Sequence, residues 1–219
     1  MANMRDDLNK QSRLRLYHSQ PTGNSYKVRL LLSILRIPYE AVDVDIFDGG
    51  NHTPEYRQIN PLGKAPALEL EDGTILTESN AILVYLATGT TYFSEERLPR
   101  AQILRWMFFE QYSHLPYIGV ARYQLHLLKK NPPPDSLRLW HERGYLALDI
   151  MDRHLAMRQW FVGDSISIAD VALYAYTHVA HEGGFELSGY GRIRAWMADI
   201  ESAPNYIPLD RRPDLVGGP

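Results

Sequence analysis

The chain of 219 residues contains no cysteine. Disulfides, zinc–thiolate sites and a cysteine nucleophile are therefore excluded. Any thiol chemistry carried out by this protein must use a thiol that a ligand supplies.

The sequence also lacks a long apolar run and an excess of either charge. No apolar stretch approaches the roughly 18 residues that span a membrane. With 23 basic and 26 acidic residues the net charge is -3, which argues against a nucleic-acid or anionic-membrane partner. Residues 1–13 are polar and carry no apolar signal core, so we expect a cytoplasmic protein.

The first half of the chain alternates between strand-like and helix-like patterns. Leu31, Leu32 and Leu35 recur at helical spacing between two strand-like runs, which predicts a parallel β-α-β unit. An Asp-Gly turn at 72–73 between two short alternating runs predicts a β-hairpin. We expect strands at 14–18, 39–46, 65–70 and 75–77, helices at 26–36 and 78–88, and mostly loop at 47–64. The fold class expected for residues 14–88 is therefore α/β with a mixed four-stranded sheet.

The second half is all-α in pattern. Turn residues, charges and a proline at 89–99 indicate a linker. Helices are expected at 100–129, 135–158, 168–182 and 190–202. This predicts an all-helical domain over 100–205, an N-terminal extension at 1–13 and a C-terminal tail at 206–219, of which residues 210–219 are expected to be loose.

The stretch "NPLGKAPALEL" places Pro66 one residue into an expected strand, although proline cannot donate to a sheet ladder. Two readings remain open. Pro66 either starts the strand in the ordinary way, or follows a cis Ala65–Pro66 bond that turns the Ala65 N–H and C=O outward.

The stretch "LTESNAILVYL" places Glu78 and Ser79 directly before an apolar helix. Ser79 suits a helix N-cap, which is a structural role. The alternative is a clamp for a free amino-acid end, with a carboxylate at the helix N-terminus and an amine beside Glu78.

The stretch "HSQPTGNSYKVRLLL" contains four small polar residues between a strand and a helix. They are Ser19, Thr22, Asn24 and Ser25. They form either a turn with a helix cap or a site that holds a ligand.

In this order, the motifs resemble the glutathione transferase family of the cytosolic type, over roughly residues 14–205. Pro66, "TESNAILVYL" and "FVGDSISIADVALYAY" at 161–176 carry the resemblance. In the last of these, Ser167 and Asp170 have capping-box spacing and a structural role. The resemblance implies a thioredoxin-like N-terminal domain, an all-helical C-terminal domain and a homodimer.

Within that family, "YHSQPTGNSYKVRLLL" looks most like the bacterial nu class, through Thr22, Asn24 and Lys27. The residues after Ser25 are similar to the zeta class, and Ser-Gln-Pro at 19–21 is similar to the theta class. The turn is about one residue longer than in the nu class.

The resemblance implies that Thr22 and Asn24 are catalytic and lie nearest the sulfur of glutathione. Hydrogen bonds to sulfur favour the thiolate, which is the nucleophile. Tyr17 and Ser19 are alternatives for this role. The Ala65 backbone would pair with the cysteinyl unit.

The resemblance also implies contacts at both ends of glutathione. Glu78 and Ser79 would hold the γ-glutamyl amine and carboxylate. Asn51 and Lys64 fall where the family often meets the glycine carboxylate, and the neighbouring His52 is an alternative.

A second substrate is expected beside the sulfur, against the helical domain. Trp106, Phe109, Ser113 and Tyr117 lie three to four residues apart, so they share one face of a helix. Such an aromatic stripe lines either a pocket or the core.

The expected activity is transfer of glutathione to an electrophilic small molecule, as in detoxification. The nu-class likeness implies an alternative, a glutathione-dependent disulfide-bond oxidoreductase or peroxidase. A third alternative is a non-catalytic glutathione-binding module. Glutathione is the expected co-substrate, and no metal is expected.

Overall fold

The structure is a computed structural model that describes residues 14–212. The extension predicted at 1–13 and residues 213–219 of the predicted tail lie outside this range.

The N-terminal half is built on a mixed four-stranded sheet with the order β2-β1-β3-β4. Its elements are β1 (Leu14–His18), α1 (Gly23–Ile34), β2 (Tyr39–Asp43), η2 (Gly50–His52), α2 (Pro54–Ile59), β3 (Ala67–Glu69), β4 (Ile75–Thr77) and α3 (Ser79–Ala87). β1 runs parallel to β2 and antiparallel to β3, and β3 pairs antiparallel with β4. The predicted thioredoxin-like arrangement is confirmed.

The C-terminal half is helical. Its elements are α4 (Arg97–Phe109), η3 (Glu110–His114), α5 (Leu115–Arg122), η4 (Tyr123–Leu127), α6 (Pro134–Leu155), α7 (Ile168–Thr177), η5 (Ala180–Gly183) and α8 (Gly191–Glu201). Within residues 14–212 no helix is long and apolar enough to cross a bilayer.

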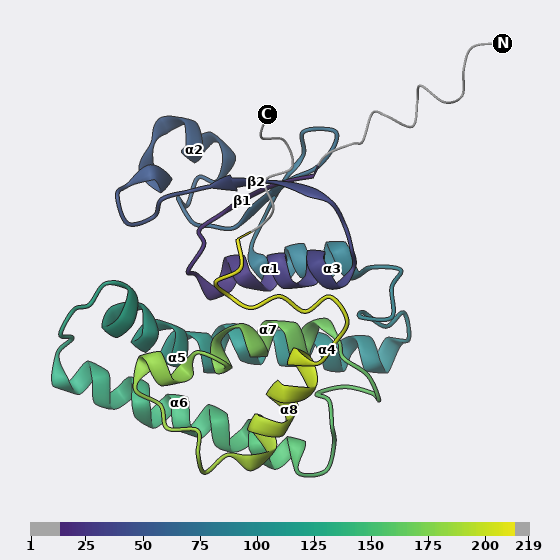
Figure 1. Cartoon of the computed structure of the whole chain (residues 1–219), viewed down its shortest axis with the longest axis vertical. Helices are drawn as coiled ribbons and strands as arrows, with labels where there is room; N and C mark the ends of the chain where they lie inside the picture. Colours follow the sequence, from purple (N-terminus) through teal and green to yellow (C-terminus); the bar gives the residue numbers. More distant parts are fainter. Residues whose placement is uncertain (1–13, 213–219) are drawn as a thin grey trace.

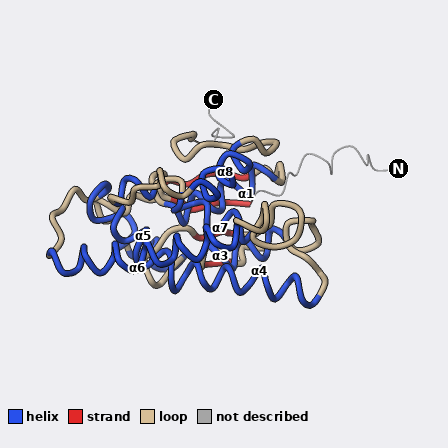
Figure 2. Tube along the Cα trace, turned by 90° about the horizontal axis from the view of Figure 1, so that it is seen from below, coloured by secondary structure: helices blue, strands red, loops and turns tan. Residues whose placement is uncertain are grey.

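The two halves pack through their helices. Figure 1 shows α1 and α3 between the sheet and the helical half, with α7 directly below them. Every residue of α7 is buried. Seen from the helical side in Figure 2, the helices lie in front of the strands. The N-terminus of α1 therefore faces the helical half.

The helix expected at 100–129 is not continuous, which corrects the prediction. α4 already begins at Arg97, inside the expected linker, and it gives way to a π-helical turn at Glu110–His114. Pro116 near the start of α5 lacks an N–H, so an ordinary α-helical ladder cannot run through it. One extra residue in a turn rotates all later side chains by about 100° around the axis.

The loop expected at 47–64 contains the short helix α2, which the prediction missed. The Thr53 hydroxyl accepts a hydrogen bond from the Tyr56 N–H, and Pro54 occupies the first helical position. A threonine cap followed by proline is a recognisable helix start.

The described part of the tail, up to residue 212, lies against α1. Side chains of α1 donate to its backbone carbonyls, with Tyr26 bonded to Ile207 O and Arg29 to Leu209 O and Arg211 O. The buried Arg29 guanidinium therefore holds the segment against α1.

Candidate functional site

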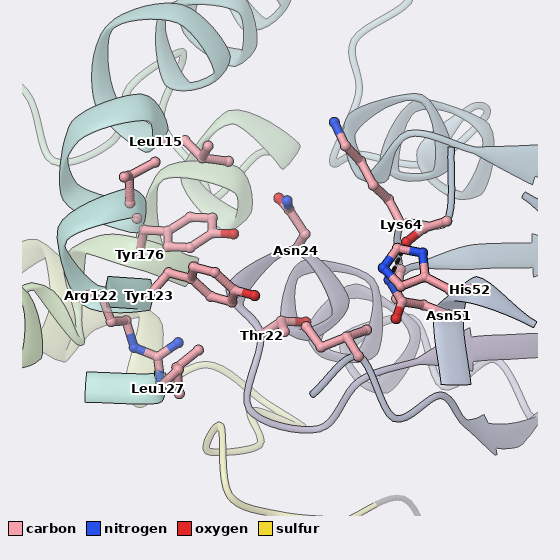
Figure 3. A pocket seen from close by; sticks show the side chains of 16 residues that line it. Thr22, Asn24, Asn51, His52, Lys64, Leu115, Arg122, Tyr123, Leu127 and Tyr176 are labelled. Atoms are coloured by element: carbon pink, nitrogen blue, oxygen red, sulfur yellow. Dashed lines mark hydrogen bonds between the residues drawn. The ribbon is translucent and has the colours of Figure 1, made fainter. Parts of the chain in front are cut away.

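A cavity of about 380 Å³ lies between the two halves, at the N-terminus of α1 (Figure 3). The N-terminal half contributes Thr22, Gly23, Asn24, Ile46, Asn51, His52, Gly63, Lys64 and Ala65, and the helical half contributes Leu115, Gly119, Val120, Arg122, Tyr123, Leu127 and Tyr176. Five residues predicted at glutathione are among them: Thr22, Asn24, Asn51, Lys64 and Ala65. None of these described lining residues is acidic, so the cavity favours anions.

The Thr22 side chain is held inside the turn before α1. Its hydroxyl oxygen lies 2.9 Å from both the Ser19 carbonyl oxygen and Ser25 Oγ. Ser25 Oγ in turn accepts the Ser19 N–H at 3.0 Å. The small polar residues of this stretch thus form a bonded turn before α1, where Thr22 is the N-cap residue but makes no side-chain cap bond, and the Thr22 hydroxyl is already bonded.

The two alternatives to Thr22 and Asn24 lie outside the cavity lining. The Tyr17 hydroxyl donates to Glu69 Oε2 at 2.8 Å, within the sheet. Ser19 is 4% exposed. The structure therefore leaves Asn24 as the side chain of this stretch that offers a donor to the cavity.

A chain of hydrogen bonds orients the Asn24 amide. Asn24 Oδ1 accepts from Ser79 Oγ at 3.1 Å, and Ser79 Oγ accepts from Lys27 Nζ at 3.4 Å. Lys27 Nζ forms an ion pair with Glu110 Oε2 at 2.9 Å, and both side chains are fully buried. Because the Asn24 oxygen accepts from Ser79, its Nδ2 is the end of the amide left to donate to a ligand in the cavity that Asn24 lines.

The Lys27–Glu110 pair also joins the two halves, since Lys27 lies on α1 and Glu110 begins η3. Burial lowers the pKa of Lys27, and the nearby Glu110 carboxylate opposes that shift. Asn80 completes the network by donating to Glu110 Oε2 at 3.1 Å. The buried amine is therefore compensated by a carboxylate from the helical half.

Glu78 and Ser79 lie where β4 leads into α3. Glu78 is exposed and has φ 66°, a left-handed conformation that costs a residue with a Cβ about 1–3 kcal/mol. The Ser79 hydroxyl is engaged with Asn24 and Lys27, so it is not free to bind a carboxylate. The backbone N–H groups at the start of α3 remain available for that purpose.

The opposite end of the cavity is formed by the segment around Gly63. Asn51 Nδ2 donates to Gly63 O at 2.6 Å, so Asn51 supports this loop. Arg57 donates to His52 Nδ1 at 3.1 Å, which leaves the proton of the neutral ring on Nε2. His52 and Lys64 are therefore the side chains at this end with donors to spare.

The Ala65–Pro66 peptide bond is cis, the less common of the two predicted readings. Ala65 lines the cavity. The preceding carbonyl of Lys64 accepts from Tyr56 Oη at 2.8 Å and from Asn60 Nδ2 at 2.6 Å. These bonds fix the position of the Ala65 backbone.

None of the four residues predicted for the second-substrate pocket lines the cavity. They are Trp106, Phe109, Ser113 and Tyr117. Trp106 is 4% exposed and packs edge-on against Phe109 and Phe161. The π turn at Glu110–His114 breaks the shared face that the spacing implied.

The helical wall of the cavity comes from α5, η4 and α7 instead. Figure 3 shows the hydroxyls of Tyr123 and Tyr176 directed toward Thr22 and Asn24. The guanidinium of Arg122 is bonded to Pro21 O and Glu182. The sequence reasoning missed these residues because only the docking of the two halves brings them to α1.

Tyr176 is wedged between two glycines. A Cβ at Gly23 would lie 2.7 Å from its ring, and a Cβ at Gly119 would lie 2.9 Å from it. Gly23 opens α1 and Gly119 belongs to α5. The ring therefore sets the spacing of the two cavity walls.

Gly23→Ala should cost about 1–3 kcal/mol of stability through overpacking and should also weaken ligand binding in the cavity. Gly144→Ala is a matched control, because its Cβ would lie 2.4 Å from the Phe185 ring, and neither residue lines the cavity. Urea unfolding and calorimetric titration with glutathione would measure both effects. Equal binding by the two folded variants would contradict the role given to the wedge.

Family models match both halves of the chain. Residues 23–88 match the glutathione S-transferase N-terminal domain, and residues 134–199 match the glutathione S-transferase C-terminal domain. The chain belongs to the glutathione S-transferase family. The resemblance found in the sequence is therefore confirmed.

Several known proteins are similar to this chain over most of its length. Disulfide-bond oxidoreductase YfcG of Escherichia coli is 30% identical over 198 residues, which cover 84% of this chain and 88% of that protein. Maleylacetoacetate isomerase of Pseudomonas aeruginosa is 28% identical over 203 residues, covering 87% and 92%. The crystal structure of a glutathione S-transferase from Pseudomonas fluorescens Pf-5 has a TM-score of 0.87 and 48% identity, covering 90% of this chain and 98% of that one.

The described part of the molecule shows no candidate metal site. Residues 14–212 contain no group of three or more His, Cys, Asp or Glu side chains placed to hold a metal ion.

Proposed function

We propose that this protein binds glutathione in the cavity and presents its thiolate to an electrophilic small molecule. The observation that supports this most directly is Asn24 at the N-terminus of α1, which lines the cavity while Ser79 occupies its Oδ1, so that Nδ2 is left as a donor. A free thiol has a pKa of about 8.5, so only about 3% of it is thiolate at neutral pH. A thiolate at this position would be stabilised.

The magnitudes are sufficient for that task. A hydrogen bond to a charged group contributes about 1.5–3 kcal/mol. A helix N-terminus adds about 0.3–1 kcal/mol. Lowering the thiol pKa by two units requires about 2.7 kcal/mol, so Asn24 and α1 together account for it.

The rest of the tripeptide fits the polar groups of the N-terminal half. The γ-glutamyl amine pairs with Glu78, and its carboxylate accepts from the backbone N–H groups that open α3. The Ala65 backbone pairs with the cysteinyl unit. Lys64 and His52 meet the glycine carboxylate, because Asn51 has its amide N–H bonded to Gly63 O.

The electrophile occupies the helical side of the cavity, against Leu115, Leu127 and Tyr123. There the thiolate forms a bond from sulfur to the electrophilic atom, and the leaving group departs with the electron pair of the broken bond. These three residues, and not Trp106, Phe109, Ser113 and Tyr117, are the proposed contacts of the second substrate.

Disulfide reduction is the second candidate function. The absence of acidic residues among those lining the cavity favours an anionic ligand such as a glutathione disulfide, and one relative is named a disulfide-bond oxidoreductase. The thiolate would attack one sulfur and release the other as a thiolate. A second glutathione would then attack the mixed disulfide, which yields oxidised glutathione and a second thiol.

The test compares substrates and variants in one assay series. Wild-type protein should turn over an aryl halide with glutathione, and Asn24→Ala should lower this rate at neutral pH, with the deficit shrinking near pH 9 because bulk thiolate becomes abundant. Glu78→Ala should weaken glutathione binding by about 1.5–3 kcal/mol in calorimetry. Thr22→Val should have a smaller effect on the rate than Asn24→Ala, because the Thr22 hydroxyl is bonded within the turn.

The outcomes separate the candidates. Much faster turnover of a small disulfide than of the halide makes disulfide reduction the better name. Wild-type protein that does not bind glutathione would refute both and leave a different ligand for the cavity.

We further propose that the protein is a homodimer, through an apolar surface on α3, α4 and η3. Leu98, Phe108 and Tyr112 are 68%, 70% and 83% exposed, and Tyr85 is half exposed. An interface that covered these elements would remove these large apolar side chains from water. The cytoplasmic location and a detoxification role stay predictions.

Phe108→Glu should shift the protein from dimer to monomer in sedimentation velocity, because a carboxylate in an apolar interface is left unpaired. Met157→Glu is the control, since Met157 is 85% exposed at the end of α6. A Phe108→Glu protein that sediments like the control would argue against this surface as the interface.

A further inference from the structure

The Tyr176 hydroxyl reaches the first turn of α1 from the opposite half of the molecule. The ring carbon that bears the hydroxyl would lie 2.7 Å from a Cβ placed at Gly23, the residue between Thr22 and Asn24. Tyr176 is 8% exposed and lines the cavity. In Figure 3 its hydroxyl points toward Asn24. The phenol oxygen is therefore located at the helix end where the thiolate is expected.

The environment keeps this hydroxyl protonated. Burial raises the pKa of Tyr176, and the Glu110 carboxylate raises it further, while Arg122 and the Asn24 backbone amide oppose the shift. The group is therefore a hydrogen-bond donor throughout the neutral range.

The hydroxyl proton also has no competing acceptor among the hydrogen bonds of the described residues, in none of which Tyr176 Oη is the donor. Thr22 differs, because its hydroxyl is bonded to Ser19 O and Ser25 Oγ. Of the Thr22 and Tyr176 hydroxyls, that of Tyr176 is the one free to donate to a ligand.

The ring is held rigidly enough to aim this donor. Gly23 and Gly119 contact its two sides, and Lys27 Nζ lies 5.5 Å from its centroid. A preorganised donor stabilises a developing charge without reorganisation at the moment of reaction.

We propose that Tyr176 is a catalytic residue, which donates a hydrogen bond from its phenol to the sulfur of bound glutathione. With Asn24 Nδ2 it would hold the thiolate between the two halves. The phenol O–H bond stays intact, the thiol proton leaves to solvent, and the sulfur electron pair then forms the bond to the electrophile. This inference rests on the proposed glutathione-dependent function.

Other ionisable groups surround the same space and will shape any pH profile. They are Lys27 on α1, Glu78 before α3, Glu110 and His114 on η3, Arg122 on α5, Tyr123 on η4, and His52 and Lys64. The test therefore compares single-atom variants in one background.

Tyr176→Phe removes only the hydroxyl and keeps the wedge. It should raise the pKa of bound glutathione by about one unit and lower turnover about fivefold near pH 6.5, with the deficit disappearing near pH 9. Thiolate absorbance of the bound tripeptide and a pH–rate profile measure these effects. The urea midpoint should fall only slightly, because the ring packing is unchanged and the one bond lost is that from the Asn24 backbone N–H to the hydroxyl oxygen.

Tyr17→Phe is the matched control, since the Tyr17 hydroxyl is bonded to Glu69 outside the cavity. It should keep the wild-type pKa of bound glutathione. If Tyr176→Phe also keeps that pKa and the wild-type profile while Asn24→Ala changes both, the ring is only a packing wedge and the inference is overturned. Wild-type protein that fails to bind glutathione would instead remove the proposed function itself.

Discussion

Asp170→Ala should lower the free energy of unfolding by about 3 kcal/mol or more, because it strands several buried donors at about 1–3 kcal/mol each. Asp170 is fully buried at the start of α7. Its Oδ2 accepts from Ser167 N at 2.8 Å and from Ser167 Oγ at 2.7 Å. Its Oδ1 accepts from Phe161 N at 3.1 Å and Trp196 Nε1 at 3.0 Å. One carboxylate thus joins the loop before α7, α7 itself and α8.

Urea unfolding of three variants would measure this effect. Asp170→Asn keeps one acceptor oxygen, so its free energy of unfolding should lie between that of wild type and that of Asp170→Ala. Asp135→Ala removes an acidic residue from the first turn of α6, where its pair with Arg138 is exposed, so it should cost at most about 1 kcal/mol. Equal midpoints for Asp170→Ala and Asp135→Ala would contradict the buried network. Glutathione affinity should not change in folded Asp170→Ala, since Asp170 does not line the cavity.

The same residue shows how far sequence reasoning reaches. The three-residue spacing of Ser167 and Asp170 predicts a local cap, and the structure contains those local bonds. The bonds to Phe161 and Trp196 come from residues 9 and 26 positions away. Spacing cannot predict them, because they depend on how α8 packs against α7.

The candidate site divides in the same way. Its N-terminal side lies on short motifs that resemble those of the family, and Thr22, Asn24, Lys64 and Ala65, which the resemblance implied, all line the cavity. The hydrogen bonds of individual atoms could not be predicted from the sequence. Asn51 Nδ2 donates to Gly63 O, and this bond depends on the conformation of the loop.

The helical side of the site was not predictable from periodicity. A regular helix at 100–129 would put Trp106, Phe109, Ser113 and Tyr117 on one face. A π turn before Pro116 changes the rotation of all residues that follow, and none of the four lines the cavity. Tyr176 lies in the stretch 161–176 that resembles the family, but the sequence did not indicate that it lines the site. Its position at α1 follows from the close packing of its ring against Gly23.

Acidification should destabilise the protein through His114, a fully buried residue on η3. Its Nε2–H donates to Thr177 Oγ1 at 3.0 Å, because the Thr177 hydroxyl itself donates to Leu173 O. Burial, together with the charge of Lys27, lowers the pKa of His114 to about 3. In the unfolded chain a histidine has a pKa of about 6.5. The unfolded state therefore binds this proton at a higher pH than the folded state does.

The sign of the effect follows from that difference. The contribution of neutral His114 to stability is fully present above about pH 6.5 and is lost as the pH falls toward the folded-state pKa, at about 1.4 kcal/mol per pH unit. His178, whose pKa burial lowers to about 4, adds to the same trend.

Urea unfolding at about pH 7.5 and about pH 5.5 isolates the His114 share of this loss. His114→Leu should lose about 1.4 kcal/mol less than wild type between the two, since it has no ring to protonate and the Thr177 hydroxyl keeps Leu173 O as its acceptor. His181→Gln, at an exposed position, should follow the wild-type pH dependence. If His114→Leu instead loses as much stability as wild type, the acid sensitivity of the protein arises elsewhere. Burial would then not hold the His114 ring neutral in the folded state.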